Sequence, residues 1–408
     1  MTHSAFEPRL KARYRAARNW LLVFQGALAV AILALFILFF TIINSSFGLV
    51  AIQNTLEPQD ITPPGISLQD LPKDSLLQIL VDYSSHGYVR FLEHQESFTE
   101  RDRSSVYQLV QDRVVQPRIV AQWSLYQSVF QRADISSQVQ QEYPAAQLSF
   151  RSWIDLDFIT STQSGQPEFA GIRTAILGSL GTIFIAIVFA FPIGVGAALY
   201  LEEFSHDNLV SRIIRTNINN LAGVPSIIYG ILGLAVFVRL LEPITSGAFF
   251  GATSSATANG RTILSAGLTL GLLILPLIII NSREAILAVP QSLRHAGYGL
   301  GATKWQTIWA HVIPSSLPGI LTGTILAISR AIGETAPMVV IGASTFITID
   351  PTGPFSKFTT LPIQIYQWTA RPQEIFHHLA AAAIIILLVL LLAMNATAIL
   401  LRNRFSHD

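Results

Sequence analysis

The sequence predicts an all-α polytopic membrane protein with six transmembrane helices and a mainly helical extracytoplasmic insert between the first and second helices. Three observations support this fold class. Only 12% of the 408 residues are charged and 51% are hydrophobic, whereas an ordinary soluble domain has about twice that share of charge. Several charge-free runs are long enough for a helix to cross the hydrocarbon core. A long polar segment separates the first of these runs from the rest.

The six predicted spans follow the apolar runs. They are Leu21–Ile43, Thr174–Leu201, Thr216–Val238, Thr262–Ser282, Ser315–Ile341 and Leu379–Leu401. The fifth span differs from the others because two charges, Arg330 and Glu334, interrupt it. The first span resembles a secretory signal, but its apolar run is too long and no small-residue cleavage site follows it. We therefore expect a retained helix.

Basic side chains predict the orientation. Twelve of them lie on one predicted side of the membrane, at Arg9, Lys11, Arg13, Arg15, Arg18, Arg212, Arg215, Arg283, Arg294, Lys304, Arg402 and Arg404. The two short loops on the opposite side hold only Arg261, Lys357 and Arg371. Because cytoplasmic loops carry the excess of Lys and Arg, both termini are predicted to be cytoplasmic.

Three regions follow from these spans: residues 1–43 with the basic N-terminus and first span, an extracytoplasmic domain at 44–169, and the five remaining spans at 170–408. The insert begins with a linker rich in turn residues (Pro58, Pro63, Pro64, Gly65) and then shows helical spacing over Leu76–Val81 and Val106–Val115. It carries 8 Lys+Arg against 15 Asp+Glu and no cysteine. Such a charge repels anions, so the insert is a poor candidate for attracting an anion such as phosphate or sulfate. A docking or gating role and a passive spacer are equally open.

The predicted cytoplasmic loop Arg283–Pro314 is the most organised connection. Pro290 suits the start of a short helix, Pro290–Tyr298, and a turn rich in glycine follows at Gly297, Gly299 and Gly301. Thr303 and Gln306 have the spacing of a capping box that opens a second helix. Trp305, Ile308, Trp309 and Val312 then recur as one apolar stripe. The alternative is an interfacial helix whose tryptophans anchor it at the level of the lipid headgroups.

This loop resembles the EAA loop of ATP-binding-cassette importer permeases. It contains His295-Ala296-Gly297-x3-Gly301-x9-His311-x-Ile313-Pro314, with the spacing of that motif's Glu-Ala-Ala-x3-Gly-x9-Ile-x-Leu-Pro. Three segments look closer still to the PstA-type phosphate permeases: Leu300–Thr307, Leu317–Gly323 and Arg330–Pro337. The last reads Arg-Ala-Ile-Gly-Glu-Thr-Ala-Pro and is the most specific of them. The resemblance covers roughly Arg173–Asn403.

The resemblance implies a MetI-like permease core and a non-enzymatic subunit of a phosphate importer in the bacterial inner membrane. The implied partners are a cytoplasmic ATP-binding subunit dimer, a second permease subunit of PstC type, an extracytoplasmic phosphate-binding protein and membrane lipid. The ATPase would bind ATP and Mg, so this chain needs no cofactor of its own. The matching ATPase-coupling residues are Arg294, His295, Ala296, Gly297, Gly301, Lys304 and Trp305. Because His295 replaces the motif glutamate, either Arg294 or His295 would supply its polar contacts or the ATPase groove would differ to match.

The charges inside the fifth span are the candidate substrate site. Arg330 and Glu334 are four residues apart, on one helical face within pairing reach. A charge at the centre of a membrane helix costs about 2.5–3.5 kcal/mol on insertion scales, so it usually has a partner or a wet cavity. Pro337 offers no N–H to the carbonyl of Gly333, and irregular helix at this depth is tolerated where it lines a cavity.

We expect Arg330 to donate to an oxyanion while Glu334 accepts from its protonated oxygen. A structural ion pair between helices is the alternative. The predicted pathway residues are Arg330, Glu334, Thr335 and Arg173; for Arg173, at the start of the second span, snorkelling to the outer interface is the alternative.

Several motifs are absent from the sequence. It contains no P-loop, no His-Glu-x2-His and no Gly-x-Ser-x-Gly. His377 and His378 adjoin without a third metal ligand, and the net charge of +1 does not indicate nucleic acid. Uphill transport would need a partner or an ion gradient. The competing functions are a permease for another oxyanion, a stand-alone secondary transporter and a membrane-anchored sensor. Secondary transporters commonly have interrupted helices in both halves of the chain. This sequence holds no second copy of the Arg330–Pro337 pattern, which argues against a secondary transporter.

Overall fold

The computed structural model divides into two units, Met1–Ser152 and Trp153–Asp408. It describes residues 10–63, 67–95, 98, 101, 103–206, 208–251, 259–343, 346–347 and 349–405. Arg9 and the Pro64–Gly65 part of the predicted linker lie outside the described residues. Residues 153–169 group with the helices that follow them, and the first span groups with the insert. The predicted 44–169 domain therefore contains residues of both units.

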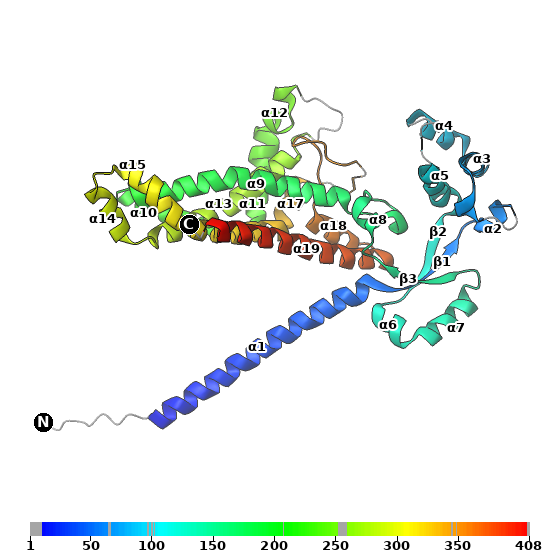
Figure 1. The fold of residues 1–408 in the computed structure, drawn as a ribbon, viewed down its shortest axis with the longest axis horizontal. Helices are drawn as coiled ribbons and strands as arrows, with labels where there is room; N and C mark the ends of the chain where they lie inside the picture. Colours follow the sequence, from blue (N-terminus) through cyan, green and yellow to red (C-terminus); the bar gives the residue numbers. More distant parts are fainter. Residues whose placement is uncertain are drawn as a thin grey trace. The chain divides into compact units, whose positions relative to one another are not determined.

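The first unit starts with a long apolar helix, α1 (Leu10–Ser46), which contains the predicted first span. Strand β1 (Phe47–Asn54) continues directly from it and is the middle strand of an antiparallel sheet with the order β2-β1-β3. The outer strands are β2 (Pro117–Gln122) and β3 (Gln147–Ser152). Phe47 pairs with Ser152, so β3 ends beside the α1 end of β1 (Figure 1).

The sheet is not predicted by the sequence. Its strands are only 8, 6 and 6 residues long. The buried residues of β1, Gly48–Ala51, are consecutive, so the alternation that marks a half-buried strand is missing.

Helices on either side of the sheet supply the rest of the first unit. Those between β1 and β2 are α2 (Pro58–Ile61), η1 (Leu68–Asp70), α3 (Lys73–Tyr83), α4 (His86–Gln95), α5 (Arg103–Val110) and η2 (Gln111–Val115). The predicted helical stretches Leu76–Val81 and Val106–Val115 are confirmed, and Leu76, Leu80 and Val106 are buried in one core. Between β2 and β3 lie α6 (Leu125–Phe130) and α7 (Arg132–Glu142), and Ile135 of α7 shares a core with Leu49 of β1.

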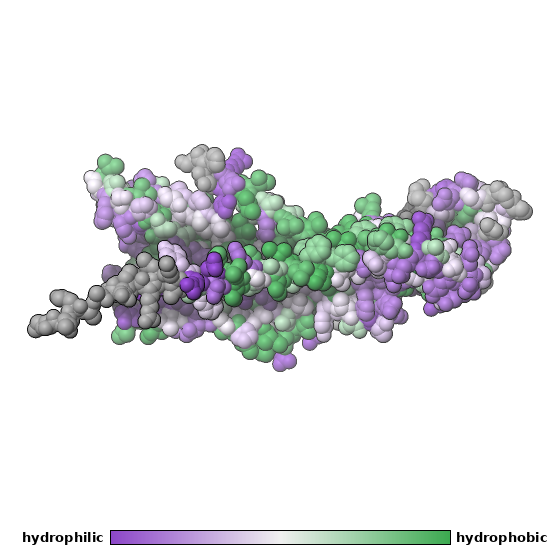
Figure 2. Space-filling view, turned by 90° about the horizontal axis from the view of Figure 1, so that it is seen from below, coloured by the Kyte–Doolittle hydropathy of each residue, from purple (hydrophilic) through white to green (hydrophobic). Residues whose placement is uncertain are grey.

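The second unit is helical in its described part, apart from loops. Its elements are α8 (Leu156–Thr160), η3 (Pro167–Phe169), α9 (Arg173–Leu199), η4 (Tyr200–Phe204), α10 (Leu209–Ala222), α11 (Ser226–Gly233), η5 (Leu234–Leu240), α12 (Glu242–Thr245), η6 (Ala248–Phe250), α13 (Ile263–Leu287), α14 (Gln291–Gly299), α15 (Lys304–Thr307), η7 (Ile308–Val312), α16 (Ile313–Gly333), α17 (Ala336–Ile341), α18 (Leu361–Thr369) and α19 (Glu374–Phe405). Hydrophobic side chains gather over the long helices, whereas hydrophilic ones cover the α2–α5 helices (Figure 2).

In the described part of the chain, five helices are long and apolar enough to cross a membrane. A sixth span is obtained if α10 and α11–η5 count together, but these two pieces meet at a bend of 103°. The prediction of one continuous helix over Thr216–Val238 is therefore wrong. Gly223 and Pro225 explain the bend, because proline lacks the N–H and glycine is a poor helix former.

The fifth span is longer than predicted at its start. One helix runs from Lys304 to Gly333 through α15, η7 and α16, so the second helix of the loop is continuous with the span. The wider π-helical turn of η7, Ile308–Val312, ends two residues before Pro314. It accommodates the proline ring, which in a regular helix meets the carbonyl four residues earlier.

Helix α13 lies at the centre of the second unit and is buried along most of its length. Small residues at Gly267, Gly271, Gly319 and Gly323 let its neighbours approach closely. A Cβ added at Gly271 would lie 2.6 Å from the ring of Phe189 in α9, and one at Gly319 would lie 2.8 Å from the Cβ of Ala285 in α13. These positions therefore set the spacing of three spans.

Gly271→Val is expected to destabilise the second unit by about 1–3 kcal/mol, because overpacking a close contact forces side chains and backbone to shift. Thermal unfolding of the purified protein in detergent measures the loss. Gly196→Val is the matched control, since Gly196 lies in α9 and an added Cβ there meets nothing within 4 Å. Equal losses at the two positions would contradict a close contact at Gly271.

Candidate functional site

The fifth span breaks at the predicted charge pair. Helix α16 ends at Gly333, Glu334 adopts extended backbone angles (φ −76°, ψ 113°), and α17 restarts at Ala336. Pro337 stands in the first turn of α17. The irregular helix expected from Pro337 is thus present, and it lies between Glu334 and Thr335.

Arg330 and Glu334 form a single, long contact. The Nε of Arg330 lies 3.4 Å from Oε1 of Glu334. Side-chain exposure is 47% for Arg330 and 18% for Glu334. Among the residues that the structure describes, the guanidinium has no other hydrogen-bond or ion-pair partner. A guanidinium group with free N–H donors is therefore available within a membrane-spanning helix.

The bend between α10 and α11 lies next to this break. The hydroxyl of Tyr229 in α11 donates to the carbonyl of Leu221 in α10 at 2.8 Å, which ties the two sides of the bend together. Gly230 faces Pro337, where an added Cβ would be 2.8 Å from the proline Cα. Two interrupted helices thus meet at the break that follows Arg330.

The structure gives Arg173 a different partner. Its Nη2 lies 2.8 Å from Oδ2 of Asp350, and the hydroxyl of Thr174 donates to Oδ1 of the same carboxylate at 3.0 Å. Arg173 is thus part of an ion pair at the start of α9, and the structure does not bring it together with Glu334. Thr335 lies at the break itself and is half-buried.

The second candidate site is the loop between α13 and α16. Helix α14 begins after Pro290 and ends at Gly299, and Gly301 adopts a left-handed φ of 82°. The predicted capping box is confirmed, since Thr303 and Gln306 exchange both hydrogen bonds. Gly297 is buried against Thr307, where an added Cβ would lie 2.8 Å from the hydroxyl oxygen. The glycine turn therefore folds α14 onto α15.

Arg294 lies inside this loop and not on its surface. It is buried, and its Nε and Nη2 donate to Oε1 of Glu203 in η4 at 3.1 and 2.7 Å. Its Nη1 and Nη2 also donate to the carbonyls of Val289 and Ile286 at 2.6 and 3.0 Å. Arg294 thus fastens α14 to the ends of α9 and α13, because all its donors point inward.

The neighbouring carboxylate extends this ion cluster. The side chain of Glu202 is only 6% exposed, with its Oε1 2.5 Å from Nε of Arg283 in α13 and 3.8 Å from Nη2 of Arg215 in α10. Two acidic side chains of η4 therefore join α10, α13 and α14. The sequence signal for this cluster is the Glu202-Glu203 pair at the end of a charge-free span, and neither residue is among the predicted site residues.

The four residues of the predicted apolar stripe do not share one environment. Ile308 and Val312 are buried in a core with Ile286 and Ile320, whereas Trp305 and Trp309 are exposed and stack at 5.8 Å between ring centroids. His295, Ala296, Gly301 and Lys304 are exposed as well. Leu300, which is not among the predicted coupling residues, is 90% exposed. We define the exposed loop face as His295, Ala296, Leu300, Gly301, Lys304, Trp305 and Trp309.

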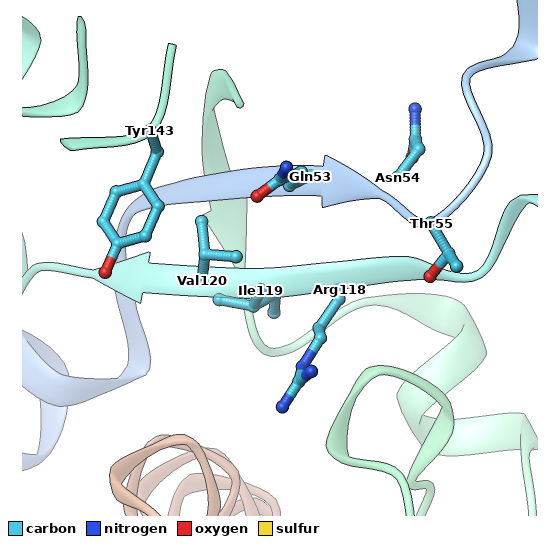
Figure 3. Close-up of a pocket in the computed structure, with 7 residues that line it drawn as sticks. All are labelled: Gln53, Asn54, Thr55, Arg118, Ile119, Val120 and Tyr143. Carbon is cyan, nitrogen blue, oxygen red and sulfur yellow. The ribbon is translucent and has the colours of Figure 1, made fainter. Parts of the chain in front are cut away.

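A separate pocket lies on the sheet of the first unit (Figure 3). Its volume is about 430 Å³, and it is lined by Gln53, Asn54, Thr55, Arg118, Ile119, Val120 and Tyr143. The Arg118 guanidinium points away from the strands in this view. None of the predicted site residues lines this pocket.

Comparison with known proteins covers both candidate sites. A family model described as a binding-protein-dependent transport system inner membrane component matches residues 190–407, which include the loop and the Arg330–Glu334 pair but not Arg173. The chain is 33% identical over 218 residues to the probable ABC transporter permease protein YqgI of Bacillus subtilis, which covers 53% of this chain and 68% of that protein.

Two further relatives carry more specific names. The chain is 35% identical over 193 residues to the phosphate transport system permease protein PstC of Pasteurella multocida, which covers 44% of this chain and 58% of that protein. It is 36% identical over 208 residues to the phosphate transport system permease protein PstA 1 of Mycobacterium tuberculosis, which covers 50% and 62%. The chain thus spans less than two thirds of the length of these two relatives.

Solved structures are also similar. An inward-facing MetNI methionine ABC transporter chain is 17% identical, with a TM-score of 0.42, and the match covers 57% of this chain and 97% of that one. A bacterial alginate ABC transporter chain, solved with an alginate pentasaccharide-bound periplasmic protein, is 18% identical, with a TM-score of 0.44 and coverage of 67% and 88%.

Proposed function

Because the chain belongs to the family of binding-protein-dependent transport system inner membrane components, we propose that it forms half of the translocation pathway of an ATP-driven importer of inorganic phosphate. The observation that carries the proposal is the partly exposed Arg330 guanidinium, held beside Glu334 at a helix break in a membrane span. The two relatives named as phosphate transport system permeases support the choice of substrate.

The pair suits an oxyanion that keeps a proton. Arg330 has donors free for the anion, and Glu334 can accept a hydrogen bond from a protonated oxygen. Phosphate at neutral pH carries at least one such proton, whereas sulfate carries none. Glu334 would repel the fully ionised anion, so the pair favours phosphate. A charged side chain that faces lipid costs free energy. The exposed side of Arg330 is therefore expected to face a water-filled path or a partner subunit.

The exposed loop face is the proposed docking surface for a cytoplasmic ATPase dimer. Exposed aromatic side chains with a large exposed leucine are typical anchors of protein interfaces, and this face holds Trp305, Trp309 and Leu300. Closure of the ATPase would move α14 together with α9 and α13, because Arg294 and Glu203 fasten these elements. ATP and Mg would be bound by that partner, since this sequence has no P-loop.

The other proposed partners complete the importer. They are a second permease of PstC type, which would form the other half of the path, and an extracytoplasmic phosphate-binding protein. The positive-inside bias supports cytoplasmic termini and an inner-membrane location. Family membership favours this arrangement over a stand-alone secondary transporter, although interrupted helices also occur in that class. A permease for another oxyanion stays the alternative within the family.

Substituting the exposed loop face is expected to weaken ATPase binding at least tenfold. Trp305→Ala removes a stacked aromatic, and truncation of such anchors commonly costs about 2 kcal/mol or more. Leu300→Ser removes the most exposed apolar side chain of the loop. Co-purification of the ATPase with each variant measures the effect. Gln291→Ala, on the exposed start of α14 outside this face, is the control and should bind normally.

Labelled-phosphate uptake in cells that lack this chain tests the function as a whole. We expect phosphate uptake to fall and to return when the chain is supplied, with sulfate uptake unchanged. Loss of sulfate uptake instead would support the other-oxyanion alternative. Phosphate transport by the purified chain alone, without an ATPase, would contradict the importer and support the secondary transporter.

A further inference from the structure

A short helix of the first unit presents an apolar face outward. Tyr126, Val129 and Phe130 of α6 stand at i, i+3 and i+4, so they share one side of the helix. They are 52%, 62% and 72% exposed, and the rings of Tyr126 and Phe130 lie 4.9 Å apart between centroids. We define these three residues as the α6 patch.

Hydrogen bonds hold the opposite side of α6 against the sheet, so the α6 patch is held facing away from the sheet. Ser128 is buried, and its hydroxyl accepts from the backbone N–H of Leu49 in β1 at 2.7 Å and donates to the carbonyl of Ser124 at 2.7 Å. A capping box between Ser124 and Gln127 holds the start of the helix. Rotation of α6 that would bury the patch would break these hydrogen bonds.

The patch lies at the level where α1 leaves the membrane. The backbone N–H of Tyr126 donates to Oδ1 of Asn44 at 2.7 Å. Asn44 is the first polar residue after the charge-free, largely apolar run Leu21–Ile43 of α1. Since that run is long and apolar enough to cross the hydrocarbon core, the start of α6 is expected within hydrogen-bond reach of the membrane surface.

We propose that the α6 patch inserts into the headgroup layer of the leaflet at the C-terminal end of α1. Continuity with a membrane-spanning helix favours lipid as the occupant, because any surface joined to Asn44 stands beside the bilayer. Tyrosine and other aromatic side chains gather at this depth in membrane proteins, with an apolar ring in the acyl boundary and a polar tip in water. The patch would hold the sheet at a fixed tilt to the membrane.

Site-directed spin labels test the proposal, and the absence of native cysteines makes single-cysteine variants straightforward. The reporters are Phe130→Cys and Val129→Cys, each in the full chain reconstituted into vesicles of phosphatidylethanolamine and phosphatidylglycerol. The matched control is Tyr83→Cys, because Tyr83 is 50% exposed and lies in α3, beyond the far end of β1. Eight strand residues separate that end from α1, about 25 Å at the usual rise.

The readout is the ratio of collision rates with oxygen, which concentrates in lipid, and with a water-soluble nickel chelate. We expect the ratio at positions 129 and 130 to exceed that at position 83 several-fold in vesicles. Equal ratios at all three positions would place the patch in water and overturn the proposal. Labels at 129 and 130 that meet neither reagent would show that protein covers the patch, which overturns it as well.

Discussion

Arg330→Gln is expected to lower phosphate uptake by about 100-fold or more. The substitution removes the charge and the fork of donors, and each charge-assisted hydrogen bond contributes about 1.5–3 kcal/mol. Two such bonds lost from the transported anion account for that factor, since about 1.4 kcal/mol is tenfold. Uptake of labelled phosphate, with the importer's assembly checked by co-purification of the ATPase, measures the effect.

The controls distinguish a residue that contacts the transported anion from one that only stabilises the fold. Arg239→Gln removes another exposed cation, at the end of η5, and is expected to change uptake far less. Glu334→Gln keeps the shape of the side chain but removes its charge, so sulfate should begin to compete with phosphate. Normal uptake by Arg330→Gln, with a lowered unfolding midpoint, would show that the pair only joins structural elements.

Arg294→Met is expected to destabilise the protein by about 3–5 kcal/mol, because it leaves the carboxylate of Glu203 buried without its partner. Thermal unfolding in detergent measures the loss, and the ATPase should also co-purify less well, since α14 is no longer fastened. The double variant Arg294→Met with Glu203→Leu is expected to recover most of the stability, as apolar replacements of buried ion pairs often do.

His295→Ala is the matched control for the stability measurement. His295 is the exposed neighbour of Arg294, and exposed substitutions usually change stability by less than about 0.5 kcal/mol. If Arg294→Met were as stable as His295→Ala but lost the ATPase, Arg294 would contact the ATPase directly, as the motif comparison implies. The burial and the inward donors of Arg294 favour the internal role.

Local patterns in the sequence predict the elements that depend on neighbours along the chain. The capping box at Thr303, the glycine turn and the helix break near Pro337 follow from side-chain chemistry within a few residues, and all three are present. Four of the six predicted spans are found within single long helices, because a charge-free run is itself the physical requirement for crossing a bilayer, and the fifth is found as α16 followed by α17.

Features that depend on contacts between residues far apart in the sequence could not be predicted from local patterns. The partner of Arg294 is 91 positions away in Glu203, and that of Arg173 is Asp350, so neither pair has a spacing that a pattern reveals. The bend at Gly223–Pro225 was hidden because a charge-free run does not distinguish one helix from two. Strand β1 was missed because it is fully buried over four consecutive residues.

The unbroken helix from Lys304 to Gly333 has a mechanical consequence. At 1.5 Å per residue, about 40 Å of stiff rod separates Lys304 from Arg330. Such a rod acts as a lever arm: a tilt of about 10° about its loop end sweeps its far end by about 7 Å, given this rise. Arg330 lies near that far end and Glu334 directly follows it, so such a tilt would displace the Arg330–Glu334 pair as a whole.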